Sequence, residues 1–329
     1  MTSQLNRTRR AILTSAALAV AGVTAPRAHA QGRYPTKPIR LLNGSPAGSS
    51  FDAITRAAAT EAEKKLGQPF IMDYKSGAGG TPAFVAAKHA APDGYTLVVV
   101  GLNTVRQPLV QDVGYDGARD FTWIASLAEI NFGVVVPADS PFKTWKDLLT
   151  WARANPTKIT YGCPAGLGNS AHIFGSEVAA REKADWVAVP FRASTDCMTA
   201  LLGGQLTFAI DTLISIAPQV RSGKARLLAL ATSQRSKLWP DVPTMKELGY
   251  ETLIESPVGI GGPAGIPPQI VQQLQDAFKF ASEQPSFLNL LEQSSLRPWY
   301  MPAAEFRRFA ERAEQEQRSL LQKYGFAKK

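Results

Sequence analysis

The chain has 329 residues, of which 45% are hydrophobic and 19% are charged, and its formal net charge is +9. This length allows two domains of ordinary size, and the composition indicates a soluble globular protein with an ample core. The basic residues are scattered and are not interleaved with aromatic residues, which argues against nucleic-acid binding.

Residues 1–30 have the pattern of a cleaved secretory signal. Arg7, Arg9 and Arg10 precede an apolar run of small residues, and Ala28-His29-Ala30 fits a signal-peptidase motif. The adjacent arginines also fit a twin-arginine signal, so the export route stays open between that and an ordinary Sec signal. Cleavage after residue 30 leaves 32 basic and 27 acidic residues, a net charge of +5. Beyond the signal, no stretch approaches the roughly 18 apolar residues that cross a bilayer.

Two cysteines, Cys163 and Cys197, remain in the mature chain. One disulfide is arithmetically possible in an oxidising compartment, and two separate buried thiols are the simpler interpretation. The sequence leaves their pairing open.

The first predicted unit is a strand, a loop and a helix over residues 39–67. Residues 39–42 form the strand, and apolar residues spaced three or four apart from Phe51 indicate a helix that ends at Gly67. Ser50 is the expected N-cap. A Gly/Ser-rich loop that opens a helix directs backbone N–H groups and the positive end of the helix dipole at one point, which suits an anion.

Similar strand–loop–helix units follow along the chain. We expect strands at residues 69–74, 95–100, 130–137, 159–163, 186–190, 206–211, 225–231 and 258–262. We expect helices at residues 82–90, 144–154, 170–182, 194–202 and 267–281, and a terminal amphipathic helix. Two such blocks predict an α/β protein with two lobes. No low-complexity linker separates the blocks, so crossing strands should join them and permit hinge closure over a ligand.

The sequence contains no G-x-S-x-G elbow, no Walker loop and no H-E-x-x-H motif. The glycines at 77–80 resemble a dinucleotide loop, but the acid required near residue 100 is missing. His89 and His172 lie far apart on predicted helices, where surface or packing roles explain them better than metal binding or catalysis. We therefore expect recognition without catalysis, no catalytic residue, no cofactor and no metal.

Several segments resemble the solute receptors of tripartite tricarboxylate transporters, also called Bug-type receptors. The resembling segments are Pro46-Ala47-Gly48 with Asp52, Gly77-Ala78-Gly79-Gly80, Ala91-Pro92-Asp93-Gly94-Tyr95-Thr96-Leu97, Leu201-Leu202-Gly203-Gly204-Gln205 with Asp211, and Leu238-Trp239-Pro240-Asp241-Val242-Pro243-Thr244. The last segment is the most specific, and the resemblance covers essentially the whole mature chain.

The resemblance implies a two-lobed periplasmic binding protein of type II with its ligand in the interdomain cleft. Lobe I would comprise residues 31–131 and 253–329, and lobe II residues 132–252. Such a receptor is not an enzyme: it captures a small carboxylate and delivers it to the membrane permease subunits of a tripartite tricarboxylate transporter. We expect it to be periplasmic and monomeric.

Carried over to this sequence, the family pocket is built from loops of both lobes. The expected ligand-binding residues are Pro46, Ala47, Gly48, Ser49, Ser50, Asp52, Gly79, Gly80, Thr81, Asn103, Thr104, Asn169, Ser170, Ser194 and Asp211.

Arg106 is added to this set because the resembled family does not typically supply an arginine in this loop. Its guanidinium could form a bidentate pair with a second carboxylate of the ligand. The alternative is a solvated arginine on the first helical turn.

Two other functions stay open at this point. One is a secreted hydrolase that acts on a carboxylate ester or amide in the same cleft, for which the sequence supplies no placed nucleophile and base. The other is a ligand sensor without its own permease, which nothing in the sequence separates from a transport receptor.

Overall fold

The computed structural model describes residues 34–164, 166–251 and 253–328. The chain divides into two units, residues 1–36 and 37–329, and all the described helices and strands lie in the second unit. The predicted signal segment, residues 1–30, lies outside the described residues. Among those described, no helix is both long and apolar enough to cross a membrane.

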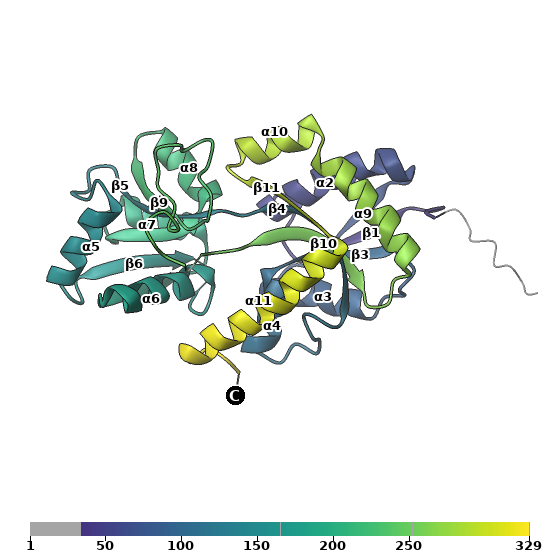
Figure 1. The fold of residues 1–329 in the computed structure, drawn as a ribbon, viewed down its shortest axis with the longest axis horizontal. Coiled ribbons are helices and arrows are strands. Elements are labelled where there is room, and N and C mark those ends of the chain that lie inside the picture. The colour runs from purple at the N-terminus through teal and green to yellow at the C-terminus, as the bar shows by residue number, and fades with distance from the viewer. Residues whose placement is uncertain (1–33, 165, 252, 329) are drawn as a thin grey trace, which may run out of the picture. The chain divides into compact units, whose positions relative to one another are not determined.

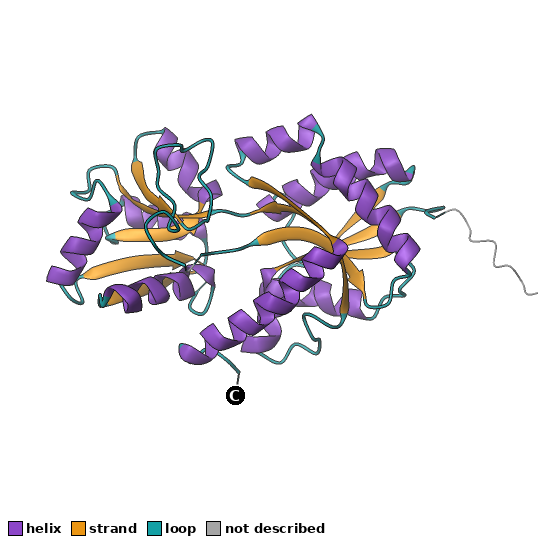
Figure 2. Cartoon of the chain, in the orientation of Figure 1, coloured by secondary structure: helices purple, strands orange, loops and turns teal. Residues whose placement is uncertain are grey.

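The strands form two mixed sheets, one in each of two lobes, and helices cover them (Figures 1 and 2). The first sheet has the strand order β11-β4-β10-β3-β1-β2. Its strands are β1 (Ile39–Asn43), β2 (Phe70–Tyr74), β3 (Thr96–Gly101), β4 (Phe121–Glu129), β10 (Pro257–Pro263) and β11 (Arg297–Pro302). β1 pairs in parallel with β2 and β3, whereas β10 runs antiparallel to both β3 and β4.

The second sheet has the order β7-β6-β8-β5-β9. Its strands are β5 (Phe132–Pro137), β6 (Ile159–Pro164), β7 (Trp186–Phe191), β8 (Phe208–Thr212) and β9 (Ala225–Leu230). β6 is parallel to β7 and β8, and β5 is antiparallel to β8 and β9. The chain therefore enters the second lobe after β4 and returns to the first sheet at β10. The exact lobe boundaries stay a prediction.

The helices lie against these sheets. Those of the first lobe are α2 (Ser50–Leu66), α3 (Thr81–Lys88), α4 (Leu102–Val110), α9 (Pro268–Ser282), α10 (Pro285–Gln293) and α11 (Ala303–Lys323), with a short 3₁₀ turn η1 (Ala78–Gly80). Those of the second lobe are α5 (Trp145–Ala154), α6 (Ser170–Glu182), α7 (Ser194–Leu202) and α8 (Leu213–Arg221).

Each sheet is buried on both faces. In the second lobe, one face packs against Leu148 of α5 and Phe174 of α6, and the other against Leu201 of α7 and Ile216 of α8. These side chains are almost fully removed from water, and each contributes about 1.5–3 kcal/mol by burial. With both faces covered, the functional groups of the lobe gather at the strand ends, as in other open α/β sheets.

Helix α2 ends as the sequence predicts, but its start differs by one residue. Gly67 adopts the left-handed conformation (φ 69°) that a C-cap glycine favours. The N-cap is Ser49 and not Ser50, because the Ser49 hydroxyl accepts a hydrogen bond from Asp52 N while Ser50 already lies inside the helix. The Ser50 expectation was therefore wrong.

Candidate functional site

A cavity of about 510 Å³ lies where strand ends of the two sheets face each other. The first lobe contributes the segment after β1, the glycines of η1 and the start of α4. The second lobe contributes the segment after β6, the start of α7 and the end of β8. Ile130 and Ser256, which belong to the two segments that pass between the sheets, also line it.

Glycines bring two loops of the first lobe into direct contact at this cavity. A Cβ atom on Gly44 would lie 2.6 Å from the Cα of Gly80, so neither loop could approach this closely with a larger residue. Gly79 has a φ of +66°, and a Cβ there would meet the Gln107 side chain at 2.1 Å. The glycine-rich pattern therefore serves a close backbone approach.

The expected cradle of backbone amides is mostly occupied by the protein itself. Gly48 N donates to Asp52 Oδ2, Ser49 N donates to Pro46 O, and Asp52 N donates to Ser49 Oγ. Gly80 N and Thr81 N donate to carbonyls of their own turn. These five amides stabilise the loops by bonding within the protein. That amides of these loops hold a carboxylate stays a prediction.

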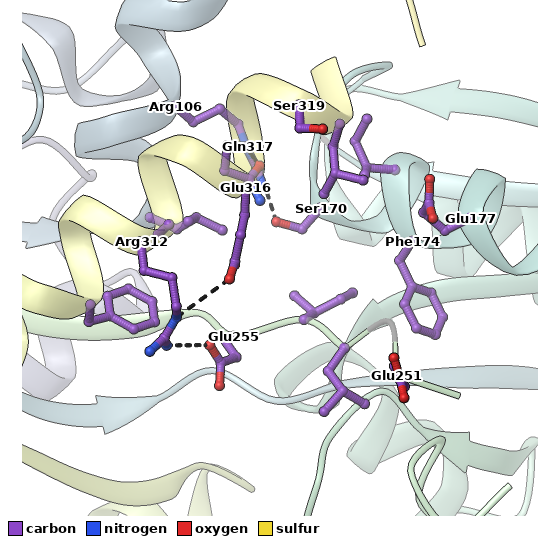
Figure 3. Close-up of a pocket in the computed structure, with 17 residues that line it drawn as sticks. Arg106, Ser170, Phe174, Glu177, Glu251, Glu255, Arg312, Glu316, Gln317 and Ser319 are labelled. Atoms are coloured by element: carbon purple, nitrogen blue, oxygen red, sulfur yellow. Dashed lines mark hydrogen bonds and ion pairs between the residues drawn. The ribbon is translucent and has the colours of Figure 1, made fainter. Parts of the chain in front are cut away.

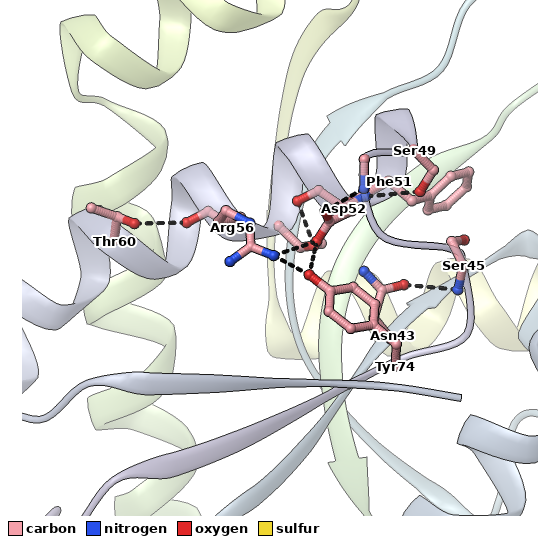
Figure 4. Close-up of polar contacts among 10 residues, drawn as sticks. Asn43, Ser45, Ser49, Phe51, Asp52, Arg56, Thr60 and Tyr74 are labelled. Carbon is pink, nitrogen blue, oxygen red and sulfur yellow. Dashed lines mark hydrogen bonds and ion pairs between the residues drawn. The ribbon is translucent and has the colours of Figure 1, made fainter. Parts of the chain in front are cut away.

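Asp52 has a structural environment beside the cavity (Figure 4). Its carboxylate accepts hydrogen bonds from Gly48 N at 2.8 Å and from the Tyr74 hydroxyl at 2.7 Å, and it pairs with Arg56 at 3.3 Å. Burial opposes ionisation, but these hydrogen bonds and the Arg56 charge outweigh it and lower the pKa of Asp52. Asp52 thus fixes the loop before α2.

Arg106 is the cation of the cavity. Its side chain on α4 is 6% exposed, so the alternative of a solvated arginine is wrong. Nε donates to Gln317 Oε1 of α11 at 2.8 Å, and Nη1 donates to Ser170 Oγ of α6 at 2.9 Å. Both partners are neutral, and burial alone lowers the pKa of Arg106 to about 10. The guanidinium is therefore buried with no carboxylate of the described residues to balance it.

The N-terminus of α6 faces Arg106 across the cavity. Asn169 is the N-cap, and its Oδ1 accepts a hydrogen bond from His172 N at 3.0 Å. The first amides of a helix have no intrahelical acceptor, so this end carries partial positive charge. Arg106 and the start of α6 together make one side of the cavity favourable for an anion.

Asp211 is the acid of the same cavity. It lies in β8 with no exposed surface, and its Oδ1 accepts hydrogen bonds from Ser194 Oγ at 2.7 Å and Thr212 N at 2.6 Å. Burial raises the pKa of Asp211 to about 6, although the bonds from Ser194 and Thr212 oppose the shift. Its Oδ2 is buried and has no hydrogen-bond partner among the described residues.

The structure brings together many of the expected site residues and separates others from the cavity. Those that line it are Pro46, Gly79, Gly80, Asn103, Arg106, Asn169, Ser170, Ser194 and Asp211. Asp52 and Thr104 are tied into caps beside it, because Thr104 Oγ1 accepts from Gly101 N at 3.1 Å. Ala47, Gly48, Ser49 and Thr81 belong to the same loops, and Ser50 begins α2. That the lining residues contact a ligand stays a prediction.

Sequence reasoning missed two side chains of the candidate site. Asn43 ends β1 and lines the cavity, and a polar residue at the end of an apolar strand was the signal that could have found it. Gln317 orients Arg106 from α11, 211 positions further along the chain, and no local pattern indicates that contact.

A second cavity, of about 720 Å³, lies between α11, α6 and the segment 251–255 (Figure 3). Arg106 borders it too, but the other arginine of its lining, Arg312, is already paired with acids. Figure 3 shows Arg312 directed toward Glu255 and Glu316, with N–O distances of 3.1 and 3.5 Å. No buried side-chain N or O atom among its described lining residues lacks a hydrogen-bond partner. The cavity at the strand ends is therefore the better candidate for a solute.

Cys163 and Cys197 are both free and buried in the second lobe. Burial raises the pKa of the Cys163 thiol to about 11 and that of the Cys197 thiol to about 12. Neither is an activated nucleophile. Within the described part of the chain, no three His, Cys, Asp or Glu side chains gather as a metal site.

Comparison with known proteins identifies the family. Residues 54–326 match the tripartite tricarboxylate transporter family receptor. A UPF0065 protein in the gbd 5′ region of Cupriavidus necator is 39% identical over 315 residues, which cover 95% of this chain and 96% of that one.

Two solved structures of Rhodopseudomonas palustris proteins share the fold. One, with adipate, has a TM-score of 0.77 at 26% identity and covers 89% of this chain and 99% of its own. The other, MatC with bound malate, has a TM-score of 0.71 at 25% identity. The match covers 88% of this chain and 100% of MatC. With its two α/β lobes and the match over most of its length, the chain belongs to the family of tripartite tricarboxylate transporter receptors, which are binding proteins and not enzymes.

Proposed function

We propose that this protein is a periplasmic receptor that captures a small dicarboxylate in the cavity at the strand ends and delivers it to a membrane permease. The observation that carries the proposal is Arg106, a buried cation whose hydrogen-bond partners are both neutral. Burying a charge without a counter-charge is costly. A ligand carboxylate would supply that counter-charge, and a guanidinium binds it with two parallel hydrogen bonds.

The two relatives with malate and adipate support the same ligand class, since both molecules are dicarboxylates of different length. One carboxylate would meet Arg106 and the start of α6. The other would meet donors elsewhere in the cavity, for which Asn43 Nδ2, which has no hydrogen-bond partner among the described residues, is a candidate. Permease subunits as partners follow from the family.

Titration calorimetry with Arg106→Gln tests the ligand class. We expect the variant to lose about 1.5–3 kcal/mol of binding free energy for succinate or adipate, because a hydrogen bond to a charged group is removed. The matched monocarboxylates, butyrate and hexanoate, should bind the parent protein more weakly than succinate and adipate, because their single carboxylate leaves the donors at the other end of the cavity without an acceptor.

Arg312→Gln is the matched control, because Arg312 lies in the other cavity and is already paired with acids. Its binding of dicarboxylates should stay unchanged. A loss in Arg312→Gln with none in Arg106→Gln would place the solute in the second cavity and contradict the proposal.

Periplasmic delivery also requires the predicted cleavage after Ala30. We expect the mature chain to begin at Gln31, and intact-mass analysis of the periplasmic fraction would check this. Retention of residues 1–30 on a membrane-bound chain would contradict it.

A further inference from the structure

Glu129 lies where the two passages between the sheets begin and end. It is the last residue of β4, from which the chain crosses to the second lobe. It pairs in register with Pro257, the first residue of β10, where the chain returns, and on its other side with Arg297 of β11. Glu129 is 3% exposed, so a buried acid lies at the base of both passages.

Arg297 joins this acid to the second lobe. Its Nε donates to Glu129 Oε2 at 2.7 Å, and its Nη2 lies 2.6 Å from the same oxygen. The guanidinium also lies over the Trp299 ring, 5.1 Å from the centroid, and these contacts fix its plane. The remaining nitrogen, Nη1, donates to Gln234 Oε1 at 3.4 Å. Gln234 follows Ala231, which lies in the core of the second lobe.

A second contact between the lobes lies two residues away. Arg221 Nη2, at the end of α8, donates to Ser295 Oγ in the turn before β11 at 3.4 Å. Residues 295–297 of the first lobe therefore touch the second lobe twice. Both hydrogen bonds are longer than the usual range, so a small separation of the lobes breaks them.

Opposing effects act on the charge of Glu129. Burial favours the protonated carboxyl group, and the nearby Glu255 carboxylate adds to this, whereas the charge and hydrogen bonds of Arg297 oppose it. The net effect raises the pKa of Glu129 to about 7. Glu255 is itself paired with Arg312 of α11, which also meets Glu316. Glu129 therefore changes its charge near neutral pH.

We infer that Glu129, Arg297 and Gln234 form a proton-sensitive contact that sets the spacing of the lobes: ionised Glu129 holds Arg297 against Gln234, and protonated Glu129 releases it. A protonated carboxyl group is neutral and holds a guanidinium less strongly, so the Arg297 side chain, which is 26% exposed, turns toward water. Proton uptake and lobe separation then favour each other, because each weakens the same contact. These three side chains are positioning residues and do not line the cavity at the strand ends.

Distance measurements on the empty protein test this inference without any solute. Spin labels on Gln273→Cys of α9 and Thr150→Cys of α5, both exposed positions, report the spacing of the lobes, while the native thiols of Cys163 and Cys197 are buried. The mean distance should lengthen from pH 8 to pH 5.5, with a midpoint near pH 7, where Glu129 titrates. Circular dichroism at both ends of the range checks that the protein stays folded. A distance that does not change with pH would overturn the inference.

Two variants assign the transition to this contact. Glu129→Gln keeps the shape but cannot ionise, so its distance should equal that of the parent protein at pH 5.5 over the whole range. Gln234→Ala removes only the exposed acceptor on the second lobe, so the long distance should again persist at every pH. Glu311→Gln is the matched control, because Glu311 is exposed and pairs with Arg307 within α11. It should keep the transition of the parent protein.

The two variants fail in different ways. A transition that persists in Glu129→Gln would overturn the role of Glu129 as the titrating group. A transition that persists in Gln234→Ala would overturn the contact between the lobes as its cause. Because Gln234 is exposed and its side chain packs in no core, this second variant decides the inference even where Glu129→Gln does not fold.

Discussion

The buried charged side chains of this protein are of two kinds. Some are paired with an opposite charge and stabilise the fold, and others line the cavity at the strand ends and have only neutral partners. Asp52 and Glu129 have partners that hold a loop or a strand end in place. Arg106 and Asp211, both in the cavity at the strand ends, have only neutral partners. Since each unpaired charge destabilises the empty protein, their retention in one cavity points to a ligand of matching charges and donors.

The raised pKa of Asp211 gives a pH dependence that can be measured. Its folded-state value is about 6 against 3.8 for the ordinary group, so the folded protein binds the proton more tightly than the unfolded chain. The ionisation of Asp211 therefore lowers the free energy of unfolding as pH rises from about 4 to 6, by about 3 kcal/mol in total. Above that range its contribution no longer changes with pH. The difference in unfolding free energy between Asp211→Asn and the parent should grow in favour of the variant by this amount over the same range.

Urea unfolding at pH 4.5 and pH 8 would measure this difference. Asp147→Asn is a control of opposite sign, because hydrogen bonds from the backbone of Lys143 and Thr144 lower the pKa of Asp147. Its carboxylate therefore adds stability that is lost as pH falls. A pH-independent difference for Asp211→Asn would show that Asp211 is not held ionised in a buried site.

Single residues of the candidate site were predictable where a strand ended in a loop. Arg106 and Ser194 follow strands with clear apolar patterns, and Asp211 lies near the end of one, so their place at the sheet edge could be expected from sequence. Their partners could not: Gln317 reaches Arg106 from the last helix, and the amides near Gly48 and Gly80 bond within their own loops. Side-chain pairing depends on tertiary contacts that no local pattern encodes.

At the scale of elements, prediction succeeded where capping residues and periodicity agreed. Both α6 and α7 begin and end at the residues expected from the sequence. The elements missed were β4, α8, α10 and β11. α8 contains Pro218, which argues against a helix interior, and β11 contains prolines that only an edge strand tolerates.

Helix α11 belongs to the first lobe but reaches the second at its C-terminal end. Tyr324 OH and Lys323 Nζ both donate to Glu177 Oε1 of α6 at 2.7 Å. Phe326 packs edge-on against His172, with ring centroids 5.1 Å apart. A small apolar cluster of Leu109, Ile173 and Leu321 completes the contact. These contacts link α11 and α4 of the first lobe to α6 of the second.

Phe326→Ala tests whether the contacts of the C-terminal segment stabilise α6. We expect it to lower the unfolding free energy by about 1–2 kcal/mol, less than the 3–5 kcal/mol of a fully buried phenylalanine, because Phe326 is partly exposed. Hydrogen exchange of α6 amides should also become faster, although α6 lies far from Phe326 in sequence. Lys328→Ala is the control, because its side chain is exposed and only its backbone N–H bonds to Leu109 O. Unchanged hydrogen exchange in α6 would mean that the terminal segment lies on α6 without stabilising it.

On the scale of the whole molecule, the chain passes between its two sheets twice around the cavity. The short passage from β4 to β5 and the longer one from β9 to β10 contribute Ile130 and Ser256 to the lining. Arg106 and Ser170 face each other from the two lobes at 2.9 Å. A ligand held by Arg106 of one lobe and Asp211 of the other would gain both contacts only when the lobes lie close together, so binding and closure should be coupled.

Small-angle scattering measures this coupling directly. With a dicarboxylate at saturation, the radius of gyration of the parent protein should fall, because the closed arrangement is favoured by contacts that only both lobes together can make. Arg106→Gln at the same ligand concentration should retain the radius of the empty protein, since it loses the contact that draws the first lobe onto the ligand. A bound parent protein whose scattering matches the empty one would mean that the cavity is preformed, and that Arg106 contributes affinity without any movement of the lobes.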